Sequence, residues 1–221
     1  MKGMWLSSGL SKIKLIFAVI PNVLTLLIKY QGRMKKILCG NEMDRMPDWT
    51  FRMMSFFFNV SDLIKSPERK LDPFDIQEGQ TVVDYGCGTG RYLKSAAEKV
   101  GDKGRIYAVD IHELSIESVN RMIRKHNLKN VNPVLSDGKT VTIPDHTVDV
   151  VYALDMFHMV KNADEFLKEL FRITKPDGIL YLEDGHQPRN LAKEKVNNSG
   201  RWTIIEETKK YMKCMPKKQT S

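Results

Sequence analysis

A glycine-rich turn between two apolar segments constrains the fold of this chain more than any other feature. The stretch Val82–Arg91 reads Val-Val-Asp-Tyr-Gly-Cys-Gly-Thr-Gly-Arg. The β-branched residues before the glycines predict a strand buried on both faces, and the apolar residues of Tyr92–Val100 recur at helical spacing. Glycines let a backbone pass close to a ligand because they lack a β-carbon. A strand, a glycine turn and a helix in this order are typical of doubly wound α/β folds that bind a ligand at the turn.

Two acidic residues flank this turn in a recognisable way. Asp84 stands two residues before the first glycine, Gly86. A second predicted strand, Arg105–Val109, ends in Asp110, at about the twenty-residue distance at which doubly wound folds place a ribose-binding acid. These features resemble the first and second motifs of class I S-adenosylmethionine-dependent methyltransferases. An ordinary strand, turn and helix without a ligand is the alternative.

The rest of the chain alternates strand and helix patterns, which predicts a doubly wound, mostly parallel sheet. Further strands are expected at Val131–Leu135, Val148–Leu154 and Ile179–Glu183, and helices at Ser115–His126, Ala163–Thr174 and Asn190–Asn198. A loop, Lys175–Gly178, is expected to close the second of these helices. Arg201–Glu206 and Lys210–Met215 could pair as a C-terminal antiparallel hairpin. The resemblance implies a seven-stranded Rossmann-like sheet.

A second motif narrows the resemblance. The stretch Leu167–Gly178 reads Leu-Lys-Glu-Leu-Phe-Arg-Ile-Thr-Lys-Pro-Asp-Gly. It resembles the L-x-E-x-x-R-x-L-K-P-G-G signature of the small-molecule branch that includes the ubiquinone/menaquinone biosynthesis methyltransferases. Asp177 replaces the first glycine of that signature. The resemblance covers Leu71–Lys217 and is specific for cofactor and fold rather than for the acceptor.

The resemblance implies S-adenosyl-L-methionine as cofactor and assigns residues to its parts. Asp84 would orient the ammonium group, Asp110 would accept hydrogen bonds from both ribose hydroxyls, and Asp137 would bond the adenine amine. A plain turn aspartate is the alternative for Asp137. The full implied set is Asp84, Gly86, Cys87, Gly88, Gly90, Asp110, Ile111, Asp137, Gly138, Ala153 and the bordering Leu154.

Methyl transfer from a sulfonium is an in-line displacement, in which positioning supplies much of the rate. A base is needed only if the nucleophile arrives protonated. Candidates follow the fourth and fifth strands, where ligands bind in such sheets. They are Asp155, His158, Asp184 and His186, and His158 could serve as base because histidine titrates near neutral pH. Structural or solvent-facing histidines are the alternative, and no metal site is predicted.

The net charge of +8 is concentrated at the two ends of the chain. Residues 1–41 contain seven lysines or arginines and no acid, and residues 209–221 contain five lysines and no acid. The remainder is net negative, which argues against a broad nucleic-acid-binding face and favours an anionic membrane surface. Solvated basic tails are the alternative.

An uncharged apolar run, Leu15–Ile28, is shorter than the roughly twenty residues of a spanning helix. It predicts an N-terminal helical appendage that contacts a membrane through residues 1–36, either lying on it or marginally spanning it. A helix packed on the catalytic domain is the alternative. Cys39, Cys87 and Cys214 form neither a disulfide pattern nor a zinc pattern, which indicates a reducing compartment, hence the cytoplasm.

Three regions follow: the basic apolar segment 1–41, an aromatic and methionine-rich helix with its linker at 42–70, and the catalytic domain 71–221. In the second region Trp49, Phe51 or Phe56 could touch substrate as part of a lid, or could pack on the sheet edge. An apolar cover favours a lipophilic small-molecule acceptor, such as a quinone precursor or a lipid. A methyltransferase of soluble thiols or metabolites, and a non-catalytic cofactor-binding module, are alternatives. The protein is expected to be a monomer or a homodimer.

Overall fold

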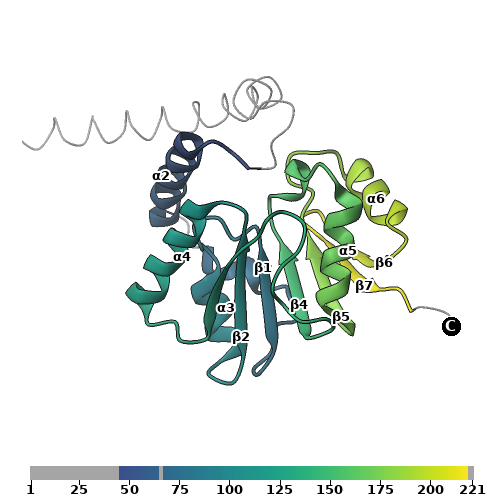
Figure 1. Cartoon of the computed structure of the whole chain (residues 1–221), viewed down its shortest axis with the longest axis horizontal. Coiled ribbons are helices and arrows are strands. Elements are labelled where there is room, and N and C mark those ends of the chain that lie inside the picture. Colours follow the sequence, from purple (N-terminus) through teal and green to yellow (C-terminus); the bar gives the residue numbers. More distant parts are fainter. Residues whose placement is uncertain (1–44, 65–66, 219–221) are drawn as a thin grey trace, which may run out of the picture. The chain divides into compact units, whose positions relative to one another are not determined.

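A computed structural model of the chain describes residues 45–64 and 67–218. The chain from Asp48 onward forms one compact unit, which is drawn in Figure 1. The predicted N-terminal appendage at residues 1–41, with its apolar run Leu15–Ile28, lies outside the described residues. No described helix is long and apolar enough to cross a membrane.

A seven-stranded sheet in the order β3-β2-β1-β4-β5-β7-β6 forms the centre of the described residues (Figure 1). Strands β1 to β5 run parallel, and β7 is antiparallel to both of its neighbours. The predicted doubly wound sheet and C-terminal hairpin are therefore confirmed. The strands are β1 (Thr81–Tyr85), β2 (Arg105–Asp110), β3 (Val131–Leu135), β4 (Val148–Ala153), β5 (Thr174–Leu182), β6 (Trp202–Glu207) and β7 (Met212–Pro216).

Helices cover both faces of the sheet. The buried cluster around α3 (Leu93–Val100) and α4 (Glu113–His126) lies on one face, and the cluster around α5 (Ala163–Ile173) and α6 (Arg189–Asn198) lies on the other. Adjacent residues of β1 point to opposite clusters, because successive side chains of a strand alternate between faces. An N-terminal helix, α2 (Asp48–Ile64), and two 3₁₀ turns, η1 (Pro67–Leu71) and η2 (Phe157–Met159), complete the described elements.

Strand order reverses between β1 and β4, which places the site. The chain leaves β1 toward β2 on one side, and β4 pairs with β1 on the other. Doubly wound sheets bind ligands outside the carboxyl ends of the strands at such a reversal. The glycine turn after β1 and the residues after β2, β4 and β5 are all at this edge.

Two predictions about connections were wrong or incomplete. The expected loop Lys175–Gly178 is part of β5, which starts at Thr174 directly after α5. Gly178 permits this because a Cβ there would lie 3.0 Å from the carbonyl oxygens of β4. The charged, proline-containing stretch 67–80, predicted from the sequence as part of a linker into the first strand, contains η1 and buries Leu71 and Phe74; the Phe74 ring stacks on Tyr181 at 4.2 Å.

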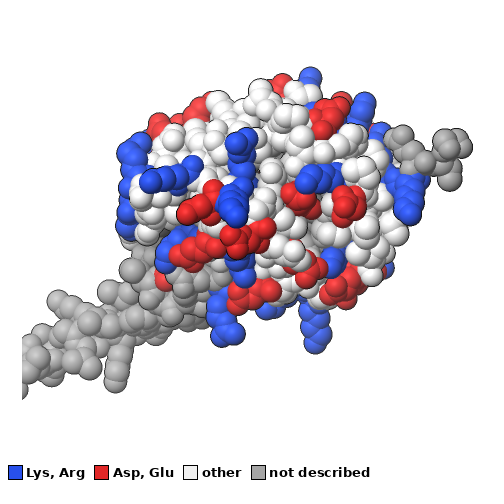
Figure 2. Space-filling view, turned by 90° about the horizontal axis from the view of Figure 1, so that it is seen from below, with Lys and Arg blue, Asp and Glu red and all other residues white. Residues whose placement is uncertain are grey.

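The surface carries both signs of charge. On the face shown in Figure 2, lysine and arginine side chains are interspersed with aspartate and glutamate. This face therefore lacks the single-sign field that steers long polyanions.

Candidate functional site

The glycine turn is fastened to the end of β2. The amides of Gly86 and Cys87 both donate to the carbonyl of Val109, at 2.8 and 3.0 Å. Gly86 has φ +81°, and a Cβ there would lie 2.8 Å from Cγ of Met156. Only glycine fits this position without strain, because the left-handed conformation and the close contact both disfavour a side chain.

Asp110 is held in one orientation by two backbone amides. Its Oδ2 accepts from the Gly88 amide at 2.8 Å and its Oδ1 accepts from the His112 amide at 2.9 Å. Burial raises the pKa of the Asp110 carboxyl, and these two hydrogen bonds oppose the rise. The carboxylate lies at the carboxyl end of β2 with Oδ2 against the glycine turn, where ribose hydroxyls are bound in doubly wound folds.

Asp84 is a buried carboxyl with an unmet hydrogen-bonding need. Its side chain is 2% exposed, and neither its Oδ2 nor the hydroxyl of Tyr152 has a hydrogen-bond partner among the described residues. Burial, and then the nearby Asp110 charge, raise the pKa of Asp84 to about 8, although Tyr152 opposes the rise. A buried carboxylate without a partner is costly. An ammonium group from a ligand would satisfy it, so this residue fits the amino-acid end of S-adenosylmethionine.

Cys87 contributes its backbone rather than its thiol. The thiol is buried 3.5 Å from the Ser115 hydroxyl, and burial raises its pKa well above the usual range. The same hydroxyl donates to the Gly88 carbonyl at 2.5 Å. The thiol therefore packs the turn against α4 as a neutral group and is not a nucleophile.

The residues expected around adenine come together beside β2. A Cβ on Gly138, which has φ +84°, would lie 3.8 Å from Cγ2 of Ile111. Asp137 is exposed, and its Oδ1 accepts from the amides of Lys139 and Thr140 at 2.8 and 2.9 Å. These bonds lower the pKa of Asp137. Asp137 therefore closes a turn, which was the alternative to a cofactor contact. Its position beside Ile111 keeps it a candidate for bonding the adenine amine.

Three of the four candidate acid–base residues meet beyond the ends of β4 and β5. His186 Nε2 lies 3.6 Å from Asp155 Oδ1, and the rings of His158 and His186 are 4.8 Å apart, edge to face. A Cβ on Gly185, which has φ +65°, would collide with His158 Nδ1. Burial raises the pKa of Asp155, and the charge of His186 opposes the rise.

The fourth candidate, Asp184, is engaged elsewhere. Both of its oxygens accept from Arg189 Nε, at 2.7 and 2.6 Å, and Arg189 Nη1 donates to the carbonyl of Thr208. Arg189 of α6 therefore joins Asp184, after β5, to Thr208, after β6, and Asp184 does not meet the histidines. Ala153, on the last residue of β4, and Leu154 after it are both buried at the edge of the site.

Sequence reasoning missed Tyr92, the residue that follows the glycine turn. Burial raises the pKa of its phenol to about 12, and the charges of Glu183, Asp84 and Asp155 act in the same direction. Tyr92 is thus a neutral hydroxyl within the electrostatic reach of both the predicted cofactor acid and the acid–base cluster. Its position directly after the turn was the available signal.

Helix α2 is attached to the cofactor side of the site. Phe51 is 4% exposed and its ring lies 4.5 Å from that of His112, whose Nδ1 caps α4 by accepting from the Leu114 amide. Further along, Arg91 pairs with Asp62, with Nε and Oδ2 3.0 Å apart. Phe51 therefore packs next to the loop that holds Asp110.

The other two predicted lid residues are exposed. Trp49 is 53% exposed and Phe56 is 64% exposed. They lie seven residues apart, on one face of α2. A contact of these side chains with substrate stays a prediction.

Comparison with known proteins identifies the family. A family model described as a methyltransferase domain matches residues 76–219. The chain belongs to the class I S-adenosylmethionine-dependent methyltransferases. The crystal structure of a SAM-dependent methyltransferase from Aquifex aeolicus is 31% identical, with a TM-score of 0.58, over 67% of this chain and 87% of that one. The family's cofactor is S-adenosylmethionine.

Sequence relatives come from quinone biosynthesis. A ubiquinone/menaquinone biosynthesis C-methyltransferase from Hydrogenovibrio crunogenus is 33% identical over 48% of this chain and 42% of the relative. A demethylmenaquinone methyltransferase from Lactobacillus johnsonii is 29% identical over 52% of this chain and 48% of the relative. The chain thus spans less than half the length of these two relatives.

Proposed function

We propose that this chain transfers a methyl group from S-adenosylmethionine to a small lipophilic acceptor by in-line displacement. The bound cofactor supplies an electrophilic methyl on a sulfonium, so the sulfur leaves as a neutral thioether. The observation that carries the proposal is Asp84, a buried carboxyl whose Oδ2 has no hydrogen-bond partner among the described residues, placed beside Asp110 at the reversal of strand order. A cationic, ribose-containing ligand satisfies both acids.

The cofactor residues hold the methyl donor by separate contacts. Asp84 would pair with the ammonium group, and Asp110 would accept from the ribose hydroxyls while the Gly88 and His112 amides fix its orientation. Ile111 and Gly138 would flank the adenine, with Asp137 near the amine. Fixing both ends of the ligand leaves the reacting methyl little freedom, and such positioning supplies much of the rate of a displacement reaction.

The acid–base cluster would take the proton that the acceptor loses. His186 would act as base toward a hydroxyl or carbon acid, with Asp155 stabilising the imidazolium. The His158 ring packs edge to face with the His186 ring, and no side chain would fit between His158 and the backbone of Gly185. General base catalysis of this kind contributes about 10²- to 10⁴-fold to the rate.

A lipophilic acceptor is supported by the aromatic character of α2 and by the functions of the relatives. Phe51 lies next to the cofactor loop, and Trp49 and Phe56 present aromatic surface on the same helix. The relatives named above are methyltransferases of ubiquinone and menaquinone biosynthesis. Water-soluble thiols or metabolites are the second candidate class, and the experiment below separates the two.

The test is a series of dihydroxyaromatic acceptors that differ only in the length of an isoprenoid side chain. We expect kcat/KM to rise with chain length, because each buried CH₂ contributes about 0.8 kcal/mol, or roughly fourfold. His186→Gln should lower kcat toward these acceptors, whereas His126→Gln, on the far end of α4, should leave kcat unchanged. A flat dependence on chain length, or better turnover of a soluble thiol, would refute the lipophilic acceptor.

Membrane contact through residues 1–36 remains a proposal from the sequence. Their basic, acid-free composition and the run Leu15–Ile28 support it. We expect the full chain to float with anionic vesicles and a chain lacking residues 1–36 to remain in the dense fraction. Flotation of the shortened chain would overturn the proposal.

A further inference from the structure

The connection between β3 and β4 is irregular and crosses the sheet. β3 is an edge strand and β4 lies beyond β1, so residues 136–147 must pass over β2 and β1. These residues contain no helix, although parallel strands are usually joined by one. Val141 and Ile143 pack into the buried cluster of α5. Interactions other than those of helices and strands must therefore fix the path of this segment.

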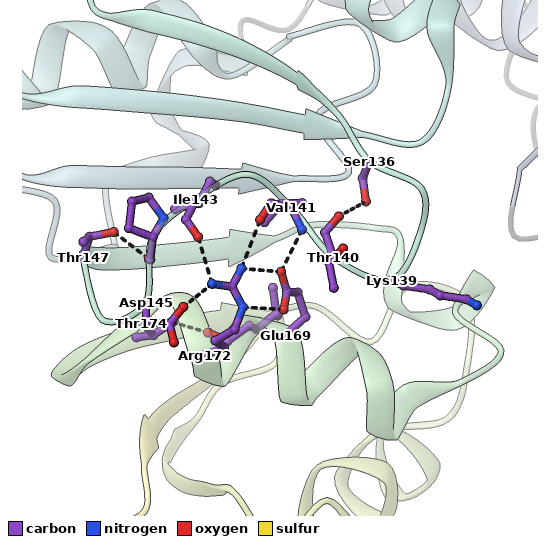
Figure 3. Close-up of polar contacts among 12 residues, drawn as sticks. Ser136, Lys139, Thr140, Val141, Ile143, Asp145, Thr147, Glu169, Arg172 and Thr174 are labelled. Carbon is purple, nitrogen blue, oxygen red and sulfur yellow. Dashed lines mark hydrogen bonds and ion pairs between the residues drawn. The ribbon is translucent and has the colours of Figure 1, made fainter.

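The guanidinium of Arg172, near the end of α5, fixes it (Figure 3). Nε and Nη2 donate to the two carboxylate oxygens of Glu169, at 2.8 and 2.6 Å. Nη2 also donates to the Val141 carbonyl at 3.1 Å, and Nη1 donates to the Ile143 carbonyl at 2.9 Å and to Asp145. All five N–H donors of the guanidinium are used, which no other side chain could reproduce.

Glu169 completes the hold on Val141. It is 5% exposed, and its Oε1 accepts from the Val141 amide at 2.8 Å (Figure 3). The amide and the carbonyl of Val141 are thus both bound to the Glu169–Arg172 pair. These are the glutamate and arginine of the L-x-E-x-x-R signature. The signature therefore has a physical reason, which is to anchor a segment about thirty residues away in the chain.

A short series of hydrogen bonds leads from Val141 to Asp137. Thr140, which precedes Val141, donates its amide to Asp137 Oδ1 at 2.9 Å and its carbonyl accepts from the Ser136 hydroxyl at 3.3 Å. Ser136 donates its amide to the Asp110 carbonyl at 2.8 Å. The turn that carries Asp137 is therefore held at one end by β2 and at the other end by α5.

We propose that Glu169 and Arg172 are positioning residues for adenine recognition, acting through Val141 on the turn that carries Asp137. They do not touch the cofactor. The inference rests on the proposed contact of Asp137 with the adenine amine. A change in the Glu169–Arg172 pair should therefore alter the preference for adenine over a base without the exocyclic amine. It should not merely weaken the binding of both ligands equally.

The test compares two ligands by calorimetry on the full chain: S-adenosylhomocysteine, and the inosine counterpart in which a carbonyl oxygen replaces the exocyclic amine. The native chain should prefer the amine by about tenfold, the effect of one hydrogen bond to a charged group. Arg172→Lys should reduce this preference toward one, because lysine has three donors and no planar fork. Arg201→Lys, which disturbs the Arg201–Asp164 pair away from the turn, should keep the native preference.

Glu169→Gln is a milder variant, because its amide oxygen can still accept from the Val141 amide. It serves as the test if Arg172→Lys does not fold, and it should also lower the preference for the amine-bearing ligand. Asp137→Ala separates the role of Asp137 from the role of the Glu169–Arg172 pair. Loss of preference in Asp137→Ala together with native preference in a folded Glu169→Gln or Arg172→Lys would overturn the positioning role alone. Equal weakening of both ligands would overturn it as well. An unchanged preference in Asp137→Ala would overturn the role of Asp137 itself.

Discussion

Asp84 gives a quantitative prediction about cofactor binding. Its carboxyl is buried with a pKa of about 8, so roughly nine in ten molecules of the free protein carry it protonated at pH 7. An ammonium group bound beside Asp84 favours the carboxylate and lowers that pKa. Binding of S-adenosylhomocysteine at pH 7 should therefore release close to one proton from Asp84.

The perturbation is Asp84→Asn, which keeps the shape of the side chain and removes the titration. The variant should release no proton from this position. It should also bind S-adenosylhomocysteine about 10- to 100-fold more weakly, because a hydrogen bond to a charged group contributes about 1.5–3 kcal/mol. The difference in proton release between the two proteins isolates Asp84 from other titrating groups, including Asp110.

Calorimetry in two buffers with different ionisation enthalpies measures the protons released on binding. The difference in binding heat between the two buffers should be larger for the native protein than for Asp84→Asn, by nearly the full difference between the ionisation enthalpies of the buffers. Equal proton release by the native protein and the variant, with both binding the ligand, would refute the assignment of Asp84 to the ammonium group.

The same residue predicts how the free protein depends on pH. The pKa of Asp84 is raised on folding, from an ordinary value of 3.8 to about 8. Its contribution to stability is therefore complete below about pH 4 and is lost as pH rises toward 8, by about 1.4 kcal/mol per pH unit. Urea unfolding should show Asp84→Asn gaining on the native protein between pH 5 and pH 8. A difference that does not grow with pH would contradict the raised pKa.

Three further substitutions test other parts of the site. Gly86→Ala places a Cβ against Met156 on a backbone with φ +81°, so calorimetry should show at least tenfold weaker binding of S-adenosylhomocysteine. Native affinity would contradict the tight fit at this position. Gly185→Ala should displace His158 and lower kcat while ligand affinity is retained, and an unchanged kcat would remove His158 from the acceptor side. Trp202→Phe removes the indole N–H that donates to the Leu167 carbonyl of α5 and should cost at least about 0.5–1.5 kcal/mol in urea unfolding; an unchanged free energy of unfolding would mean that this hydrogen bond does not stabilise the fold.

The parts of the fold that follow local patterns were predictable from the sequence. The turn after β1, the helix α3 and the acid ending β2 are set by neighbouring residues, whose spacing alone indicates strand, glycine turn and helix. The hairpin β6–β7 was found for the same reason. The start of β5 was missed because proline and glycine at Lys175–Gly178 indicate a turn, whereas Gly178 serves to bring two strands close together.

The acid–base cluster was predictable only as a location. The rule that ligands sit beyond the carboxyl ends of parallel strands placed Asp155, His158 and His186 together. The same rule could not show that Asp184 lies apart from these three residues, because its pairing with Arg189 depends on side-chain geometry. Likewise the signature around Glu169 was recognisable, but its partners lie in an irregular segment that no local pattern describes.

The most direct test of the account is transfer of labelled methyl from S-adenosylmethionine by the full chain, with membrane lipids and soluble metabolites extracted and supplied separately. Asp110→Ala, which removes the ribose-binding carboxylate, serves as the inactive control. We predict that the native chain moves label into the lipid phase and that the control does not. Label confined to soluble metabolites would contradict the lipophilic acceptor, and no transfer by a folded chain that binds S-adenosylhomocysteine would contradict the proposed activity.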